Sequence, residues 1–134
     1  MTITLDGNVI VAAFASRGLC NSVFELCLDR FHIVINEFIL DEVRKALINK
    51  IKMPINQVNI IIDFLKDFCD IITHDKPAVR VCRDLDDDNI LSLAKASKSS
   101  MIITGDKDLL ILKKYKNIKI LTPRDFWDEV RKIK

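Results

Sequence analysis

Four acidic residues that lie far apart in the sequence stand where an apolar run ends or a helical pattern begins. They are Asp6, Glu42, Asp87 and Asp106. In an open parallel α/β sheet, ligands bind beyond the carboxyl ends of the strands, so residues at such ends face one crevice. Asp6 and Asp106 follow two of the apolar runs and fit that position. Gathered at one edge, these acids would hold a divalent cation.

The chemistry of such a cluster favours a hard metal ion. Carboxylate oxygens are hard ligands, and the chain has only two histidines and four cysteines without a C-x-x-C pair. We therefore expect Mg²⁺ or Mn²⁺ rather than zinc. Two such ions about 3.5–4 Å apart would activate a water and stabilise the leaving oxygen of a phosphodiester. Taken singly, each acid also has an ordinary explanation as a strand terminator, a surface acid or a helix cap.

The third acid belongs to a run of aspartates between positions 84 and 88. Asp87 precedes two apolar residues by three and four positions, which places it on the buried face of a helix. Asp88 turns away from that face, while Asp84 and Asp86 suit the helix N-terminus, where the dipole favours carboxylates. Because the aspartates are adjacent, the sequence leaves open whether Asp87 or Asp88 is the third acid of the site.

Length and composition indicate a single globular domain spanning residues 1–134, with 49% hydrophobic and 30% charged residues. The longest apolar stretch, Val9 to Ala15, is too short to cross a bilayer, so we expect no membrane association and a cytoplasmic location. Residues 1–97 carry 11 basic and 14 acidic side chains, whereas residues 98–134 carry 10 and 5. A basic half beside an acidic cluster suits a polyanionic ligand, although a solvated lysine-rich surface explains it equally well.

Short β-branched runs alternate with longer stretches of helical period, which predicts an α/β sandwich with a central parallel sheet of four or five strands. The expected strands cover residues 2–5, 32–35, 70–73, 101–104 and 118–121. The expected helices cover about 19–30, 37–50, a segment opened by Pro54, 87–98, 107–115 and 123–132. Glu42 borders the apolar stripe of its helix. Gly105 is expected to adopt an unusual backbone conformation before Asp106.

Three segments together resemble the PIN-domain family. They are Asp6-Gly7-Asn8-Val9-Ile10, the aspartate run at 84–88, and Ile103-Thr104-Gly105-Asp106-Lys107-Asp108-Leu109-Leu110. The similarity covers essentially the whole chain, and the T-G-D-x-D-L-L stretch is its most specific part. It is strongest to the short bacterial and archaeal members regarded as toxins of toxin–antitoxin pairs.

The resemblance implies a three-layer α/β/α fold and a metal-dependent ribonuclease that hydrolyses single-stranded RNA with Mg²⁺ or Mn²⁺. It implies Asp6, Glu42, Asp87 and Asp106 as pocket acids, with Asp6, Asp87 and Asp106 as the metal ligands. Supporting roles fall to Asn8, Thr104, Asp84, Asp88 and Asp108. A homodimer and a small antitoxin protein that reaches into the pocket are the implied partners.

Two alternatives to a ribonuclease remain open. Gly7 stands where the family usually has threonine or serine, so the chain could be a catalytically weak module that binds RNA or protein. A haloacid-dehalogenase-like phosphatase also has an aspartate after its first strand, but it needs a second one two residues later, where this chain has Asn8.

Overall fold

A computed structural model of the chain describes residues 1–75 and 85–132. Within these residues, six strands form one sheet in the order β3-β2-β1-β4-β6-β5. The strands are β1 (Thr2–Leu5), β2 (His32–Ile35), β3 (Asp70–Ile71), β4 (Met101–Ile103), β5 (Lys114–Tyr115) and β6 (Ile118–Leu121). Every pairing is parallel except that of β5 with β6. The predicted parallel sheet of five strands is therefore confirmed, with one short antiparallel strand added at its edge.

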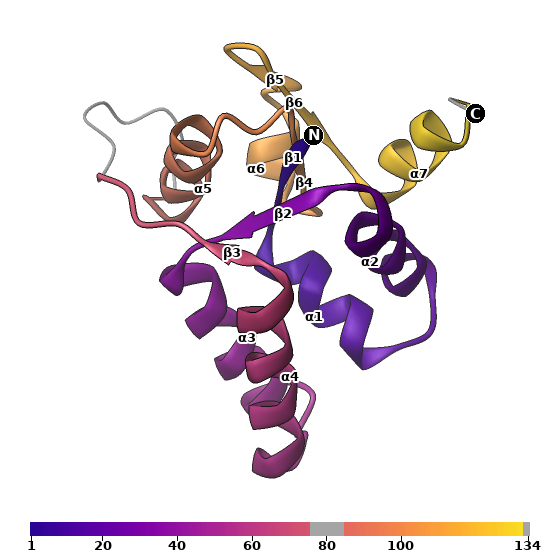
Figure 1. Cartoon of the computed structure of the whole chain (residues 1–134), viewed down its shortest axis with the longest axis vertical. Coiled ribbons are helices and arrows are strands. Elements are labelled where there is room, and N and C mark those ends of the chain that lie inside the picture. The colour runs from indigo at the N-terminus through magenta and orange to yellow at the C-terminus, as the bar shows by residue number, and fades with distance from the viewer. Residues whose placement is uncertain (76–84, 133–134) are drawn as a thin grey trace.

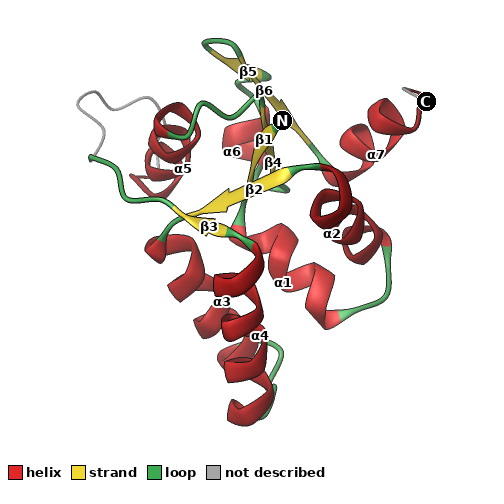
Figure 2. Ribbon diagram, viewed as in Figure 1, coloured by secondary structure: helices red, strands yellow, loops and turns green. Residues whose placement is uncertain are grey.

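Seven helices flank this sheet in the described part of the chain. They are α1 (Gly7–Ala15), α2 (Leu19–Arg30), α3 (Glu37–Asn49), α4 (Ile55–Phe68), α5 (Leu85–Ala96), α6 (Lys107–Leu110) and α7 (Pro123–Lys132). Helix α1 contacts α2 and α3, while α4 packs against α3 and α7 against α2. Helices α5 and α6 lie on the other side of the sheet (Figure 1), and the colouring by secondary structure in Figure 2 shows the strands between the two groups of helices. The expected α/β/α sandwich is confirmed.

The central strands are apolar because both of their faces are covered by helices. Ile3 and Leu5 of β1 and Ile102 and Ile103 of β4 have no exposed surface. Continuous burial of this kind is typical of parallel strands inside an α/β sheet, where an alternating polar face is not needed. The carboxyl ends of β1 and β4 are consequently fixed side by side in the middle of the molecule.

Two elements differ from the sequence-based expectation. Helix α1 was not predicted, because the run from Val9 to Ala15 is apolar on all sides and shows no helical stripe. The helix expected over 107–115 ends at Leu110, and the chain turns into β5 instead. Lys113 and Lys116 adopt positive φ angles of 59° and 54°, which α-helical geometry does not allow.

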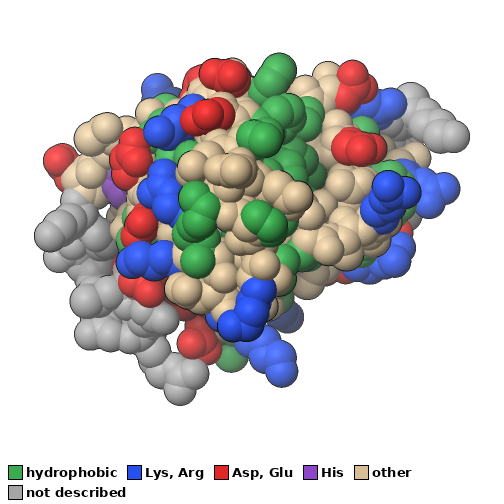
Figure 3. Space-filling view, turned by 90° about the horizontal axis from the view of Figure 1, so that it is seen from below, with side chains coloured by type: hydrophobic (Ala, Val, Ile, Leu, Met, Phe, Trp, Pro, Cys, Tyr) green, Lys and Arg blue, Asp and Glu red, His purple; other side chains and the backbone are tan. Residues whose placement is uncertain are grey.

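The end of the molecule that carries α4 has a mixed surface, with hydrophobic side chains between lysines, arginines and acids (Figure 3). Exposed apolar side chains of α4 include Ile55, Ile60 and Phe68.

No single helix in the described ranges is long and apolar enough to span a membrane. Helices α1 and α2 reach the required length and hydropathy only as a pair bent by 110°, which core helices of other proteins also do.

Asn36, at the carboxyl end of β2, joins three separate segments. Its Oδ1 accepts the Ile39 N–H and caps α3, while its Nδ2 donates to Asn89 Oδ1 of α5 at 3.0 Å and to His74 Nε2 at 2.9 Å. An amide nitrogen only donates, so His74 accepts at Nε2 and carries its proton on Nδ1, which donates to the Asp75 carbonyl. Asn36 is 5% exposed, so these bonds hold α3 and α5 together in the interior.

We expect Asn36→Ala to lower the free energy of unfolding by about 2 kcal/mol, since it removes a helix cap and two buried hydrogen bonds. Asn36→Ser keeps a side-chain acceptor for the Ile39 N–H and loses the donors to Asn89 and His74 without adding a charge, so its loss should be smaller. Urea denaturation of the three proteins measures the difference. Equal stability of all three would show that Asn36 does not join these segments.

Candidate active site

Asp6 ends β1 and is held by three groups. Its N–H donates to the Ile103 carbonyl of β4 at 3.0 Å, so the sheet pairing continues to this residue. Its carboxylate accepts the Gly7 N–H at 2.7 Å, which caps α1, and the Thr104 hydroxyl at 2.7 Å. The Asn8 amide lies farther away, at 3.4 Å. Asp6 is only 5% exposed, so its orientation is fixed by these partners.

Burial raises the pKa of Asp6 above its ordinary value, and the nearby charge of Asp106 raises it further. The hydrogen bonds from Thr104, Gly7 and Asn8 act in the opposite direction without cancelling the effect of burial. A carboxylate in this position is stabilised by any positive charge brought close to it. The site is therefore electrostatically suited to a cation.

The turn after β4 supplies the second acid. Thr104 is fully buried, and its hydroxyl oxygen accepts the Asp106 N–H at 3.0 Å while donating to Asp6. The Gly105 N–H donates to the Asn8 Oδ1 at 3.1 Å, so the loops after β1 and β4 are tied together twice. The expected unusual conformation of Gly105 is wrong, because no glycine in the described residues has a positive φ angle.

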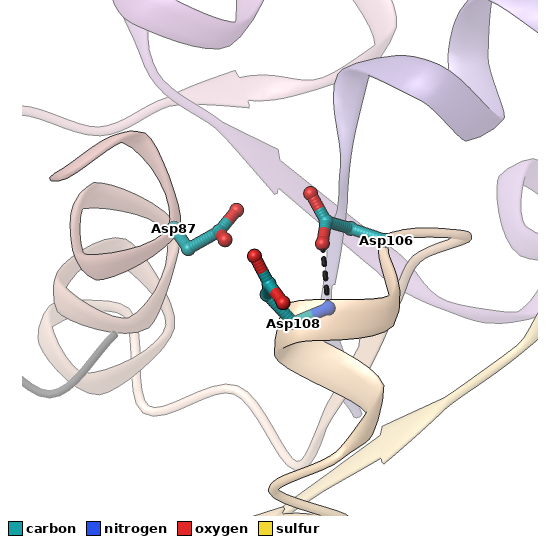
Figure 4. Close-up of side chains that lie close together, drawn as sticks. All are labelled: Asp87, Asp106 and Asp108. Carbon is teal, nitrogen blue, oxygen red and sulfur yellow. Dashed lines mark hydrogen bonds between the residues drawn. The ribbon is translucent and has the colours of Figure 1, made fainter. Parts of the chain in front are cut away.

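Three carboxyl groups converge beside this turn (Figure 4). Asp106 caps α6 by accepting the Asp108 N–H at 2.8 Å, and Asp87 reaches in from α5. One oxygen from each of Asp87, Asp106 and Asp108 lies within 4.8 Å of the other two. Asp87 is 3% exposed, whereas Asp106 and Asp108 are partly exposed.

This donor set fits a hard divalent cation. All of the donors are carboxylate oxygens, the type that Mg²⁺ and Mn²⁺ prefer. Oxygens bound to one Mg²⁺ at about 2.1 Å lie at most about 4.2 Å apart, so a small closure of the three side chains would suffice. Asp6 is not a member of the three-oxygen cluster but faces the same cavity.

Asp6, Asp87 and Asp106 line one cavity of about 610 Å³, a size typical of ligand sites. One face of α1 and one face of α3 form its walls, and the start of α5 closes one end. Its lining residues are Asp6, Gly7, Asn8, Val11, Ala12, Ala15, Glu42, Lys45, Ala46, Asn49, Lys50, Ile51, Asp86, Asp87, Ile90 and Asp106.

The four acids singled out in the sequence thus line one cavity, together with Asn8. Thr104 lies behind them, where it bonds to Asp6. Asp87 faces the cavity, whereas Asp88 is buried without lining it. Asp84 lies outside the described residues.

Sequence reasoning missed several contributors to this site. Asp108 was expected only in an outer position, yet it belongs to the three-oxygen cluster. Asp86 was expected as a helix cap and lines the cavity. Lys45 and Asn49 were not singled out, although they follow Glu42 by three and seven positions and so share its helical face.

Space remains beside Gly7 for a larger residue. A Cβ atom at this position would lie 3.7 Å from Val43 Cγ2 and 3.8 Å from the Cβ and Oε1 atoms of Glu42, which are ordinary contacts. Its φ angle is not positive, so a side chain would bring no backbone strain. A hydroxyl here would lie next to the Glu42 carboxyl group.

Comparisons with known proteins agree with this fold. A family model described as a PIN domain matches residues 2–108. The uncharacterized protein MJ1680 of Methanocaldococcus jannaschii is 31% identical over 143 aligned residues, covering 97% of this chain and 92% of that protein. The structure of VapBC2 from Rickettsia felis bound to a DNA fragment from their promoter has a chain that superposes with a TM-score of 0.63 at 18% identity. The superposition covers 91% of this chain and 98% of that one, and it concerns the fold alone.

Replacement of Asp6 by asparagine should raise the midpoint of thermal unfolding near pH 7 in the presence of a chelator. Because burial raises the pKa of Asp6 above 3.8, the wild type loses stability as the pH rises from that value through the higher folded one. Asparagine keeps the acceptor for the Gly7 N–H and removes the charge, whereas its amide nitrogen cannot accept from the Thr104 hydroxyl; this second loss does not depend on pH, so the pH dependence of the difference reports the charge. Thermal melts between roughly pH 4 and pH 8 would show the gap opening with pH.

Addition of Mn²⁺ should reverse this order, since an ion that binds only the folded protein stabilises it, and the wild type binds it more tightly. Asp63→Asn, at an exposed position of α4, is the control and should change neither result. A midpoint of Asp6→Asn that does not rise relative to the wild type between roughly pH 4 and pH 8 in chelator would contradict the electrostatic account.

Proposed function

The chain belongs to the PIN-domain family, and on that basis we propose that it is a Mg²⁺- or Mn²⁺-dependent endoribonuclease that hydrolyses single-stranded RNA. The observation that carries the proposal is the convergence of the Asp87, Asp106 and Asp108 carboxyl groups within 4.8 Å, with Asp6 facing the same cavity. Carboxyl groups held this close repel one another, and a divalent cation between them would relieve that repulsion.

A bound divalent ion would supply Lewis acidity, activating a water and stabilising the oxygen that leaves phosphorus. Asp87, Asp106 and Asp6 would hold it, and Asp108 would join them as a further acid. Glu42 faces them from α3 and would orient the attacking water by accepting its hydrogen bond. Thr104 and Asn8 fix the two loops through their bonds to Asp6 and Gly105, so the acids are positioned before substrate arrives.

The biological role that fits best is the toxin of a toxin–antitoxin pair acting in the cytoplasm. The family resemblance and the shared fold with VapBC2 support a small antitoxin protein as partner. We propose a homodimer as the working unit on the basis of the resemblance alone. Binding of a purified candidate antitoxin to this chain, followed by loss of RNA cleavage, tests the role.

One observation favours a second candidate function, a catalytically weak module that binds RNA or protein. Gly7 leaves no hydroxyl beside Glu42, at the place where the family usually has threonine or serine. Calorimetric titration with Mn²⁺ separates the two candidates, since an enzyme of this kind must bind the ion. Absence of binding at millimolar Mn²⁺ would favour the module.

Cleavage of single-stranded RNA should fall by about 100-fold or more in Asp106→Asn and Asp87→Asn, because each loses a charge that holds the ion. Asp88→Asn should have a much smaller effect, since Asp88 does not line the cavity. Initial rates in Mg²⁺ and in Mn²⁺ measure this, with Asp63→Asn as control. Wild-type rates in Asp106→Asn would rule the mechanism out, and a larger loss in Asp88→Asn than in Asp87→Asn would move the third acid by one position.

Gly7→Ser should increase the cleavage rate roughly two- to tenfold, the range expected for one added hydrogen bond to the Glu42 carboxylate. Gly7→Ala occupies the same space without a hydroxyl and is the matched control. Single-turnover kinetics with excess enzyme would isolate the chemical step. Equal changes in both variants would show that a hydroxyl at this position contributes nothing.

A further inference from the structure

The cavity is a groove between two helices with different chemistry at its two ends. Its α1 wall consists of Asn8, Val11, Ala12 and Ala15, and its α3 wall of Glu42, Lys45, Ala46 and Asn49. Both sets repeat at intervals of three and four residues, so each is one continuous helical face. The acids stand where these helices begin, and Lys45 and Lys50 stand towards the end of α3. Eight residues separate Glu42 from Lys50, which is about 12 Å along a helix.

The charged side chains of the groove are also divided between its two ends. All five acids that line the groove lie at the sheet edge or at the start of α5, or one turn into α3. Lys45 and Lys50 lie farther along α3 than Glu42 does. Lys45 pairs with Asp41 of its own helix at 3.0 Å, and both are solvent-exposed enough for water or phosphate to compete. Lys50 is exposed and forms no ion pair within residues 1–75 and 85–132.

Between the two ends, the floor of the groove is apolar and open. Val11, Ala12, Ala15 and Ala46 present small side chains, and Ile51 is 41% exposed beside them. Small apolar residues leave room for a flat ring or a sugar to lie against the helices. The acids therefore stand at one end of the groove, Lys45 stands one turn from Glu42 beside the apolar Ala46, and Lys50 stands at the other end.

We propose that Lys45 and Lys50 bind a backbone phosphate of single-stranded RNA next to the nucleotide that is cut, with the intervening nucleotide lying on the apolar floor. This subsite rests on the proposed ribonuclease function and adds to it the direction in which the substrate lies. An RNA strand carries negative charge at regular intervals, so it can meet a metal at one end of the groove and ammonium groups at the other. A neutral or basic peptide segment would not be attracted to both the metal and the lysines.

Lys50 also has a structural explanation, because a cation at the end of a helix interacts favourably with the helix dipole. Lys66 in the last turn of α4 shares that feature and does not line the groove, so Lys66→Gln is the matched control. The test variant is the double substitution Lys45→Gln and Lys50→Gln. Both lysines are exposed, so folding should be retained, which the thermal midpoint checks.

Binding of a short labelled single-stranded RNA is measured by fluorescence anisotropy at several salt concentrations, with Ca²⁺ in place of Mg²⁺. We expect the double variant to bind roughly tenfold more weakly at low salt, and its salt dependence to flatten by about 0.7 in the logarithmic slope, the value for one lost phosphate contact. In Mg²⁺, KM should rise while kcat at saturating RNA stays unchanged. The affinity of the double variant for Mn²⁺ should equal that of the wild type.

The possible outcomes test the lysine subsite separately from the proposed ribonuclease function. RNA cleavage with identical KM and salt slope in the double variant and in Lys66→Gln would overturn the subsite and leave the nuclease standing. Lysine-dependent RNA binding without cleavage would support the subsite and overturn the nuclease. Failure of the wild type to bind RNA at all would overturn both.

A second variant tests the apolar floor independently of charge. Ala12→Leu fills the middle of the groove, so it should weaken RNA binding several-fold while leaving Mn²⁺ binding and the salt slope unchanged. Ala96→Leu, at an exposed position near the end of α5, is its control. Unchanged RNA affinity in Ala12→Leu would show that no nucleotide lies on this floor.

Discussion

The hydrogen bonds that hold the Asp6 carboxylate join the ends of the two central strands, and the other acids take their positions from them. Thr104 donates to Asp6 and at the same time accepts the Asp106 N–H, so one hydroxyl sets the spacing between two acids. Asp106 in turn caps α6 through the Asp108 N–H and thereby places Asp108. The bond from Thr104 to Asp6 is buried, where hydrogen bonds hold geometry most firmly, and the other two links are partly buried. A shift of Asp6 would therefore displace the whole acidic group.

The same turns also start helices, which explains how so many acids can be tolerated together. Asp6, Asn36 and Asp106 each follow a strand and cap the next helix with a side-chain oxygen. Helix α5 begins with three aspartates. The positive ends of four helix dipoles thus point towards the acidic edge and offset part of its charge. Burial, and to a smaller extent the charge of Asp106, still raises the pKa of Asp6, so a cation brought close to its carboxylate would stabilise it.

Much of this arrangement follows from local sequence, and the remainder depends on contacts made only after folding. Strand positions follow from β-branched runs, and the helical phase of Asp87 relative to its apolar neighbours places it on the cavity side. Helix α1 escaped prediction because its cavity-facing residues are apolar like its core-facing ones, so no stripe reveals its period. The closeness of Asp108 to Asp87, and the bridge from Asn36 to Asn89, arise because α5 packs next to the turn after β4 and the start of α3. No local pattern encodes that packing.

The opposite charges of the groove impose an order on binding. Five acids at one end repel a polyanion, and this repulsion acts over about 10 Å at moderate salt, which includes Lys45 and extends nearly to Lys50. In the proposed function, RNA would occupy the acidic end only when a divalent cation has already neutralised part of its charge. In the proposed subsite, the lysines would offset the remaining repulsion between the acids and the RNA. They would also keep the RNA strand along α3 during cleavage. Metal binding and substrate binding are then coupled through charge, without any change in the fold.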